Sequence, residues 1–133
     1  MDFLIHLSQA ERKKIPVAKN LELSEKEGKR LNDVIGYMMD QIERDISLGE
    51  IAKLACLSPT SFCRFFKQHT GQSFQKFFKT LKMQKAAQDL LSSPELAIQD
   101  IALGLGFFNQ SSFNRVFKSI YKLSPSSYRK LNS

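Results

Sequence analysis

The chain has 133 residues and a net charge of +7, which leaves room for one domain or for two very small ones packed together. Hydrophobic residues make up 42% of the chain, enough to fill a core, and no apolar run approaches the roughly 20 residues that a membrane span requires. Two cysteines, Cys56 and Cys63, are too few for the disulfide framework of a small secreted protein, and the first ten residues lack the basic start of a signal peptide, so we expect a cytoplasmic protein.

The positive charge is concentrated in the second part of the chain. Residues 1–50 hold 8 Lys and Arg against 10 Asp and Glu, a net charge of −2. Residues 51–133 hold 12 Lys and Arg against 3 Asp and Glu, a net charge of +9. Such a segment favours a polyanionic partner, with nucleic acid before an anionic membrane, although a basic surface that only meets solvent is the simpler alternative.

The first 44 residues predict two helices with a linker between them. Phe3, Leu4, Leu7 and Ala10 recur at helical spacing within residues 1–14. Residues 15–28 lack sustained periodicity and contain Pro16 and Gly28, so we expect a linker there. The next helix is predicted over residues 29–44, with one apolar face made by Leu31, Val34, Ile35, Met38, Met39 and Ile42.

From Ile46 onward the sequence predicts short helices with clear end signals. Ser47 and Glu50 have the spacing of a capping box, Ser58-Pro59 suits the start of a helix, and Gly71 suits the end of one. We expect helices over residues 48–55, 59–70, 73–91, 97–103, 110–120 and 125–131. The longest of them, 73–91, is predicted to bury Phe74, Phe77, Phe78, Leu81, Ala86, Leu90 and Leu91. No segment has the alternation of a strand, so the predicted fold is all-α with about seven helices.

The predicted helices from residue 48 onward contain an internal repeat. Ile51-Ala52 matches Ile101-Ala102 at an offset of 50 residues. The pattern F-x-R-x-F-K at residues 62–67 matches residues 113–118 at an offset of 51, so one residue is inserted in the turn of the second copy.

Each copy predicts a helix-turn-helix unit with a basic second helix. The two Phe residues of the pattern are four apart and share a buried face, whereas Arg64 and Arg115 point about 200° away from the first Phe of their copy. This arrangement suits a recognition helix in the major groove of DNA. The alternative is a helical repeat that only builds a core, but a solenoid needs at least three units and this chain has two.

At these residues the chain resembles the C-terminal DNA-binding domain of the AraC/XylS family of bacterial transcription regulators. The resemblance covers residues 31–131 and is most specific in the second copy. It rests on Ile51-Ala52, Ser58, Phe62, Arg64, Phe66-Lys67 and Thr70-Gly71, then on Ile101-Ala102, Gly106-Phe107, Ser112-Phe113, Arg115, Phe117-Lys118, Ser124-Pro125 and Tyr128-Arg129.

The resemblance implies two homeodomain-like helix-turn-helix subdomains that bind double-stranded DNA. We expect the first subdomain at residues 29–79, the connecting helix at 73–91 and the second subdomain at 92–133. Residues 1–28 are expected to be the end of a regulatory domain that is absent here, and a small free-standing regulator is the alternative. An effector ligand is expected only through that domain.

Two positions depart from the family pattern. The connecting helix usually carries Arg where this chain has Lys82, so we expect the bidentate contact or ion pair of that Arg to be lost. The Gly usual before Ser124-Pro125 is Lys122 or Leu123 here, so we expect the turn to lack its easy left-handed cap.

The family motif also assigns the groove-facing residues. They are Thr60, Ser61, Cys63, Arg64 and Lys67 in the first unit, and Gln110, Ser111, Asn114, Arg115 and Lys118 in the second. Arg64 is suited to guanine, Gln110 and Asn114 to adenine, and Lys67 to phosphate. A contact to phosphate alone is the equal alternative for each Arg.

Other functional classes find little support. His6 and His69 are far apart, and Cys56 and Cys63 lack the spacing of a redox or zinc motif, so we expect no enzyme, no metal and no cofactor. Gly104-Leu105-Gly106 begins like a dinucleotide loop but is better explained as a turn that permits close approach. The competing hypothesis is a protein-interaction module whose helices contact a partner such as RNA polymerase.

Overall fold

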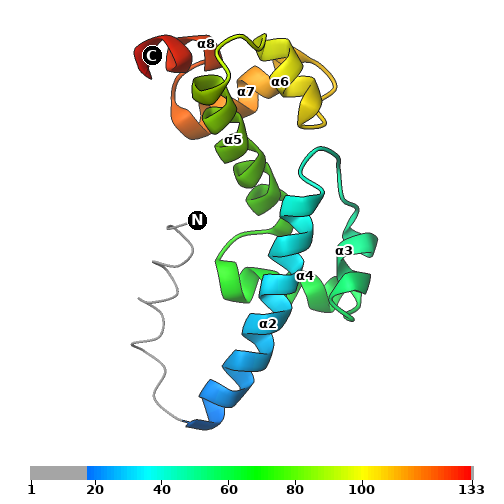
Figure 1. The fold of residues 1–133 in the computed structure, drawn as a ribbon. Helices are drawn as coiled ribbons and strands as arrows, with labels where there is room; N and C mark the ends of the chain where they lie inside the picture. The colour runs from blue at the N-terminus through cyan, green and yellow to red at the C-terminus, as the bar shows by residue number, and fades with distance from the viewer. Residues whose placement is uncertain (1–17, 133) are drawn as a thin grey trace.

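The computed structural model describes residues 18–132, and the side chains of residues 25–132. Those residues form seven α-helices and no strand (Figure 1), which confirms the predicted all-α fold. The helices are α2 (Ala18–Asp40), α3 (Leu48–Leu54), α4 (Pro59–Thr70), α5 (Phe74–Ser92), α6 (Ile98–Gly104), α7 (Gln110–Tyr121) and α8 (Pro125–Asn132). The helix predicted over residues 1–14 lies outside the described residues.

The start of α2 corrects the predicted linker. The helix begins at Ala18, so residues 18–28 are helical and only the first part of the predicted linker remains untested. Residues 18–27 are mostly strong helix formers (Ala, Leu, Glu and Lys), and they outweigh the roughly 1 kcal/mol that Gly28 costs inside a helix. The helix also ends at Asp40 rather than Arg44, and its 23 residues make it longer than α5 with 19.

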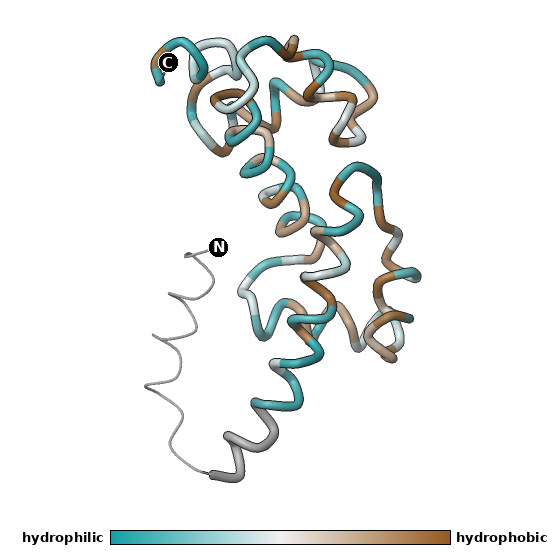
Figure 2. Tube along the Cα trace, in the orientation of Figure 1, coloured by the Kyte–Doolittle hydropathy of each residue, from teal (hydrophilic) through white to brown (hydrophobic). Residues whose placement is uncertain are grey.

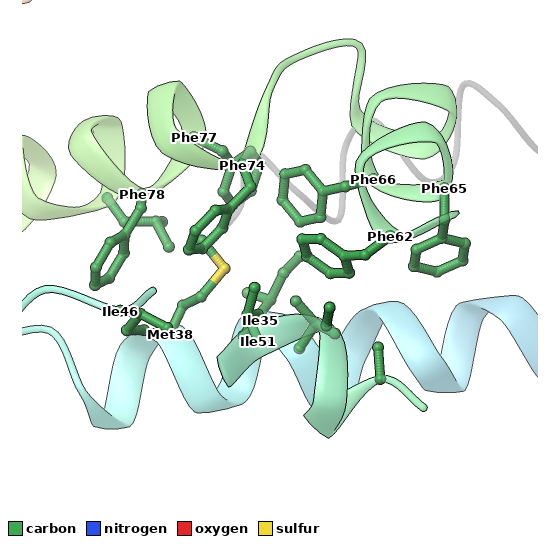
Figure 3. Packing of buried hydrophobic residues seen from close by; sticks show 14 residues of the cluster. Ile35, Met38, Ile46, Ile51, Phe62, Phe65, Phe66, Phe74, Phe77 and Phe78 are labelled. Carbon is green, nitrogen blue, oxygen red and sulfur yellow. The ribbon is translucent and has the colours of Figure 1, made fainter. Parts of the chain in front are cut away.

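A Phe-rich core holds α2, α3, α4 and the first half of α5 together. Phe66 contacts Phe74 and Phe77 edge to face, with ring centroids 6.3 and 5.1 Å apart. Val34 and Met38 of α2 are fully buried in the same cluster, and Figure 3 shows Met38 on the α2 side of it. Met39 is 43% exposed, so its predicted place on the buried face is wrong.

A second core lies around the other half of α5. Met83, Ala86 and Leu90 of α5 are buried there with Phe113 and Phe117 of α7. Leu91 is 40% exposed, which corrects the expectation that it lies in this core. Leu91 and Met39 both line an open groove between α2, α5 and α8, and this groove accounts for the exposure of both side chains.

The helix α5 is the element that the two cores share. In Figure 1 it runs from the α2–α4 group to the α6–α8 group, and in Figure 2 hydrophilic and hydrophobic residues alternate along the helices, as amphipathic helices require. The closely packed helix pairs are α3 with α4 on one side and α6 with α7 on the other, and α5 packs against helices of both groups. The fold is therefore two small helical groups that share one long helix.

Candidate nucleic-acid interface

The two repeat copies fold into matching helix-turn-helix units. In the first unit the Ser58 hydroxyl accepts the backbone N–H of Ser61 at 3.2 Å and caps α4. In the second unit the Asn109 side-chain oxygen accepts the N–H of Ser112 at 2.8 Å and caps α7. These caps satisfy N–H groups that have no partner inside the helix, and they fix where each second helix begins.

The turns between the helices match as well. Cys56 and Gly106 occupy equivalent positions after α3 and α6, and both have left-handed backbones, with φ of 61° and 85°. In each unit the following residue closes the turn, through Leu57 N–H to Ala52 O at 2.9 Å and Phe107 N–H to Ala102 O at 3.1 Å. The residue inserted in the second copy is therefore Phe108, between this turn and the cap at Asn109. Its side chain is 92% exposed, a feature that no pattern in the sequence predicted.

The second helix of each unit buries its Phe residues and exposes its cations. Phe62, Phe65 and Phe66 of α4 are buried, as are Phe113 and Phe117 of α7. Of the predicted groove-facing residues, Ser61, Gln110 and Asn114 are half-buried, and the exposed ones are Thr60, Cys63, Arg64, Lys67, Ser111, Arg115 and Lys118. The structure therefore places both predicted sets on helix faces that solvent can reach in whole or in part.

The four predicted cations on these faces are not engaged elsewhere. Among the described side chains, Arg64, Lys67, Arg115 and Lys118 have neither an ion pair nor a hydrogen-bond partner. An exposed Lys or Arg gains most from a partner of opposite charge when its head group is otherwise only hydrated. Two equivalent pairs of such cations suit a ligand with regularly spaced negative charges.

Asn114 differs from the other members of the set. Its side-chain oxygen is buried and has no hydrogen-bond partner within the described part of the chain. Buried polar atoms without a partner are rare in folded proteins. A contact from Asn114 to an adenine base therefore requires its side chain to rotate outward.

Arg44, a cation in the segment before α3, is engaged in bonds within the protein instead. The Arg44 guanidinium donates to the Glu50 carboxylate, and the Tyr37 hydroxyl donates to the same group. Hydrogen bonds from Arg44 first and Tyr37 second lower the pKa of Glu50 to about 2, with help from the Ser47 backbone of the predicted capping box. This network joins α2 to α3 and leaves Arg44 engaged.

The two departures from the family pattern have structural answers. Lys122 adopts the left-handed conformation itself, with φ of 66°, and its N–H donates to Lys118 O at 2.8 Å, so the turn forms without glycine. Lys82 is buried, and its ammonium donates to three backbone carbonyls. These three hydrogen bonds take the place of the Arg contact that we expected to be lost.

The other described side chains that the sequence singled out are His69, Cys56 and Cys63. The His69 ring lies 3.2 Å from the Glu27 carboxylate and against Phe65, which is a structural role. Within the residues that the structure describes, no three His, Cys, Asp or Glu gather as metal ligands, and no helix is long and apolar enough to cross a membrane. Cys56 and Cys63 are exposed free thiols.

Comparison with known proteins gives a consistent result. A family model described as a helix-turn-helix domain matches residues 51–131. An uncharacterised HTH-type transcriptional regulator of Haemophilus influenzae is 38% identical over 102 residues, which are 77% of this chain and 34% of that protein. The chain thus spans about a third of the length of this relative.

Solved structures agree with the fold. A transcriptional regulator from Chromobacterium violaceum, described by its AraC-type DNA-binding domain, is 25% identical, with a TM-score of 0.73 over 77% of this chain and 91% of that one. The DNA-binding domain of AdpA, solved in complex with a target DNA, is 22% identical and has the same fold, with a TM-score of 0.72 over 77% and 91% of the two chains. The matched family model, the tandem units and these likenesses show that the chain belongs to the AraC/XylS family of transcription regulators and carries its helix-turn-helix DNA-binding domain.

Proposed function

We propose that the chain binds specific double-stranded DNA sequences, with α4 and α7 in successive major-groove segments on one face of the duplex. The observation that supports this best is the pair of equivalent, unpartnered cations on each helix, Arg64 with Lys67 and Arg115 with Lys118. The AdpA domain, which has the same fold, was solved with its DNA. Residues 29–79 and 92–133 are then two DNA-binding subdomains joined by the helix at 73–91.

The length of α5 suits this placement. A helix of 19 residues is about 28 Å long, and equivalent major-groove segments lie about 34 Å apart along straight DNA. The shortfall leads us to propose that the DNA bends toward the protein, so that both helices enter their grooves.

Side-chain chemistry then suggests the role of each residue. Arg64 and Arg115 offer bidentate contacts to guanine, whereas Lys67 and Lys118 suit phosphate. Thr60 and Cys63 can contact a thymine methyl group, and Ser61 and Ser111 lie near the helix starts, where backbone N–H groups favour phosphate. Gln110 suits adenine, and Asn114 does so once its side chain rotates.

Selection from a random DNA pool tests the proposed function. The full chain is bound to duplexes with a randomised stretch of about 30 base pairs, and the recovered sequences are aligned. We expect two short motifs about one helical turn apart, because each recognition helix reads its own segment. Recovery of unrelated sequences after repeated rounds would contradict sequence-specific binding.

A protein-interaction surface is the second candidate, because Phe108 is 92% exposed beside the start of α7. We propose RNA polymerase as the partner of this surface, and the cytoplasm as the compartment in which such a regulator binds its DNA. We propose no catalytic activity. An effector ligand, if one acts on this regulator, would bind outside these two subdomains.

A further inference from the structure

Lys82 lies at the junction of the two helical groups. It is in the middle of α5 and is 3% exposed. Its ammonium donates to Ile42 O at 2.6 Å and to Arg44 O at 3.0 Å, both just after α2, and to Leu105 O at 2.7 Å, at the end of α6. A lysine has three N–H donors, so one side chain uses all of them to join the first group to the second.

The surroundings explain how a buried ammonium is tolerated there. Leu105 is the C-cap residue of α6, where helix carbonyls lack partners and carry the negative end of the helix dipole. The Phe78 ring lies 4.6 Å from Nζ and adds a cation–π contact. Burial lowers the pKa of Lys82 to about 8, while Asp45 and Glu43 oppose that shift, so the group is mainly charged at neutral pH.

Gly106 gives independent evidence for the same junction. A Cβ atom there would lie 3.0 Å from Glu43 O and 3.3 Å from the Arg44 Cα. The equivalent residue of the first unit is Cys56, which has a similar left-handed backbone and an exposed side chain. The turn itself therefore tolerates a side chain, and glycine at 106 serves the close approach of the segment after α2.

We propose that Lys82 is a positioning residue that holds the two recognition helices in one relative orientation and thereby sets the spacing between the two DNA segments that the chain reads. The proposal rests on the function proposed above. Two other features join the two groups: the Ile42 side chain packs against both cores, and α5 runs through both. Removing the ammonium leaves three carbonyls without a donor and frees the two groups to move about α5.

A distance measurement tests the orientation without DNA. Spin labels are placed on Gln68→Cys and Ser119→Cys, exposed residues at equivalent positions of α4 and α7, in a chain with Cys56 and Cys63 replaced by Ser. We expect one narrow distance distribution in the parent chain and in Lys82→Arg, and a broader one in Lys82→Met. Lys79→Met removes an exposed charge three residues away and should leave the distribution narrow. Equal widths in Lys82→Met and the parent chain would overturn the proposal.

The matching DNA experiment reads the spacing. The selected duplex is compared with versions that carry one or two extra base pairs between its two motifs. Each added base pair rotates one motif relative to the other by about 34° around the duplex axis. We expect the parent chain and Lys79→Met to lose about tenfold or more in affinity with the longer spacings, and Lys82→Met to lose less than about threefold. An unchanged spacing preference in Lys82→Met would contradict the inference alone, whereas absence of specific binding by the parent chain would contradict the proposed function.

Thermal unfolding shows which variant to interpret. If Lys82→Met is not folded at the temperature of these measurements, Lys82→Gln takes its place, because its amide keeps a donor and removes the charge. The same broadening and the same loss of spacing preference are expected, and their absence in a folded Lys82→Gln would overturn the proposal.

Discussion

Lys122 forms the turn after α7 in a backbone conformation that costs free energy for a residue with a side chain. It ends α7 with φ of 66°, where the equivalent residue of the first unit is Gly71 with φ of 78°. A side chain in the left-handed region costs roughly 1–2 kcal/mol, because Cβ approaches the following carbonyl. The hydrogen bond from Lys122 N–H to Lys118 is nonetheless kept.

We therefore expect Lys122→Gly to stabilise the protein. The gain should be about 0.5–1 kcal/mol, since relief of strain exceeds the added entropy of an unfolded glycine. Urea unfolding measures it, with Lys122→Ala as the control that also removes the long side chain but keeps Cβ. A Lys122→Gly protein no more stable than Lys122→Ala would show that the backbone is not strained there.

Glu50 should make stability depend on pH. Its pKa is about 2 in the folded protein against an ordinary value of 4.5, so the unfolded chain binds more protons between these values. The stabilisation is fully present above pH 4.5 and is lost as the pH falls toward 2. We expect the melting temperature of the native chain to fall over this range more steeply than that of Glu50→Gln, with Glu95→Gln, an exposed carboxylate elsewhere, as control. Parallel curves for the native chain and Glu50→Gln would contradict this.

Arg64 and Lys67 should differ in what they contribute to binding. If Arg64 contacts a guanine, Arg64→Ala weakens binding to the selected duplex by about 1–3 kcal/mol and relaxes the preference at one base pair. Lys67→Ala, a phosphate contact, weakens binding to selected and random duplexes alike. Competition titrations measure both, and an equal loss on the two duplexes for Arg64→Ala would leave only a phosphate contact.

At the scale of the helices, residues of the same type differ in burial and therefore in their expected contribution to stability. Phe66 is fully buried among other Phe rings, whereas Phe108 is 92% exposed. We expect Phe66→Ala to lower the free energy of unfolding by about 3–5 kcal/mol and Phe108→Ala to change it by less than about 0.5 kcal/mol. Chemical denaturation checks this, and a large loss for Phe108→Ala would show that its ring packs against the protein.

Local signals made most helices predictable from the sequence. Ser58 and Gly71 act as the predicted caps of α4 and Ser73 caps α5, and both helices begin and end within about one residue of the expectation. The start of α2 was not predictable in this way, because Gly28 read as an end signal although neighbouring helix formers outweigh it. Met39 and Leu91 were misplaced because periodicity does not show an open groove between helices.

The parts of the candidate site also differ in how far they could be predicted from the sequence. The exposed faces of α4 and α7 follow from a pattern within six residues, so Arg64 and Arg115 could be placed from the sequence. The partners of Lys82 lie 40 and 23 residues away, at Ile42 and Leu105, and no local rule relates them. Only the packing of the two groups brings these carbonyls to one ammonium.

At the scale of the whole molecule, the duplication explains both the likeness and the difference of the two units. Their caps and turns are equivalent, yet the groove-facing residues other than the shared Arg and Lys pairs differ in part, and Phe108 is added in the second turn. Two such units on one shared helix are suited to reading two unlike DNA segments. Their fixed orientation would then make the spacing between the segments part of the recognised sequence.

Salt-dependent DNA binding tests the central claim most directly. Fluorescence anisotropy measures the affinity of the chain for the selected duplex and for a scrambled one between 50 and 200 mM salt. For about 4–6 phosphate contacts, log K should fall linearly with log salt with a slope of about −4 to −5, and the selected duplex should bind about a thousandfold more tightly at physiological salt. Equal affinity for the two duplexes at every salt concentration would contradict the claim that the tandem units read DNA sequence.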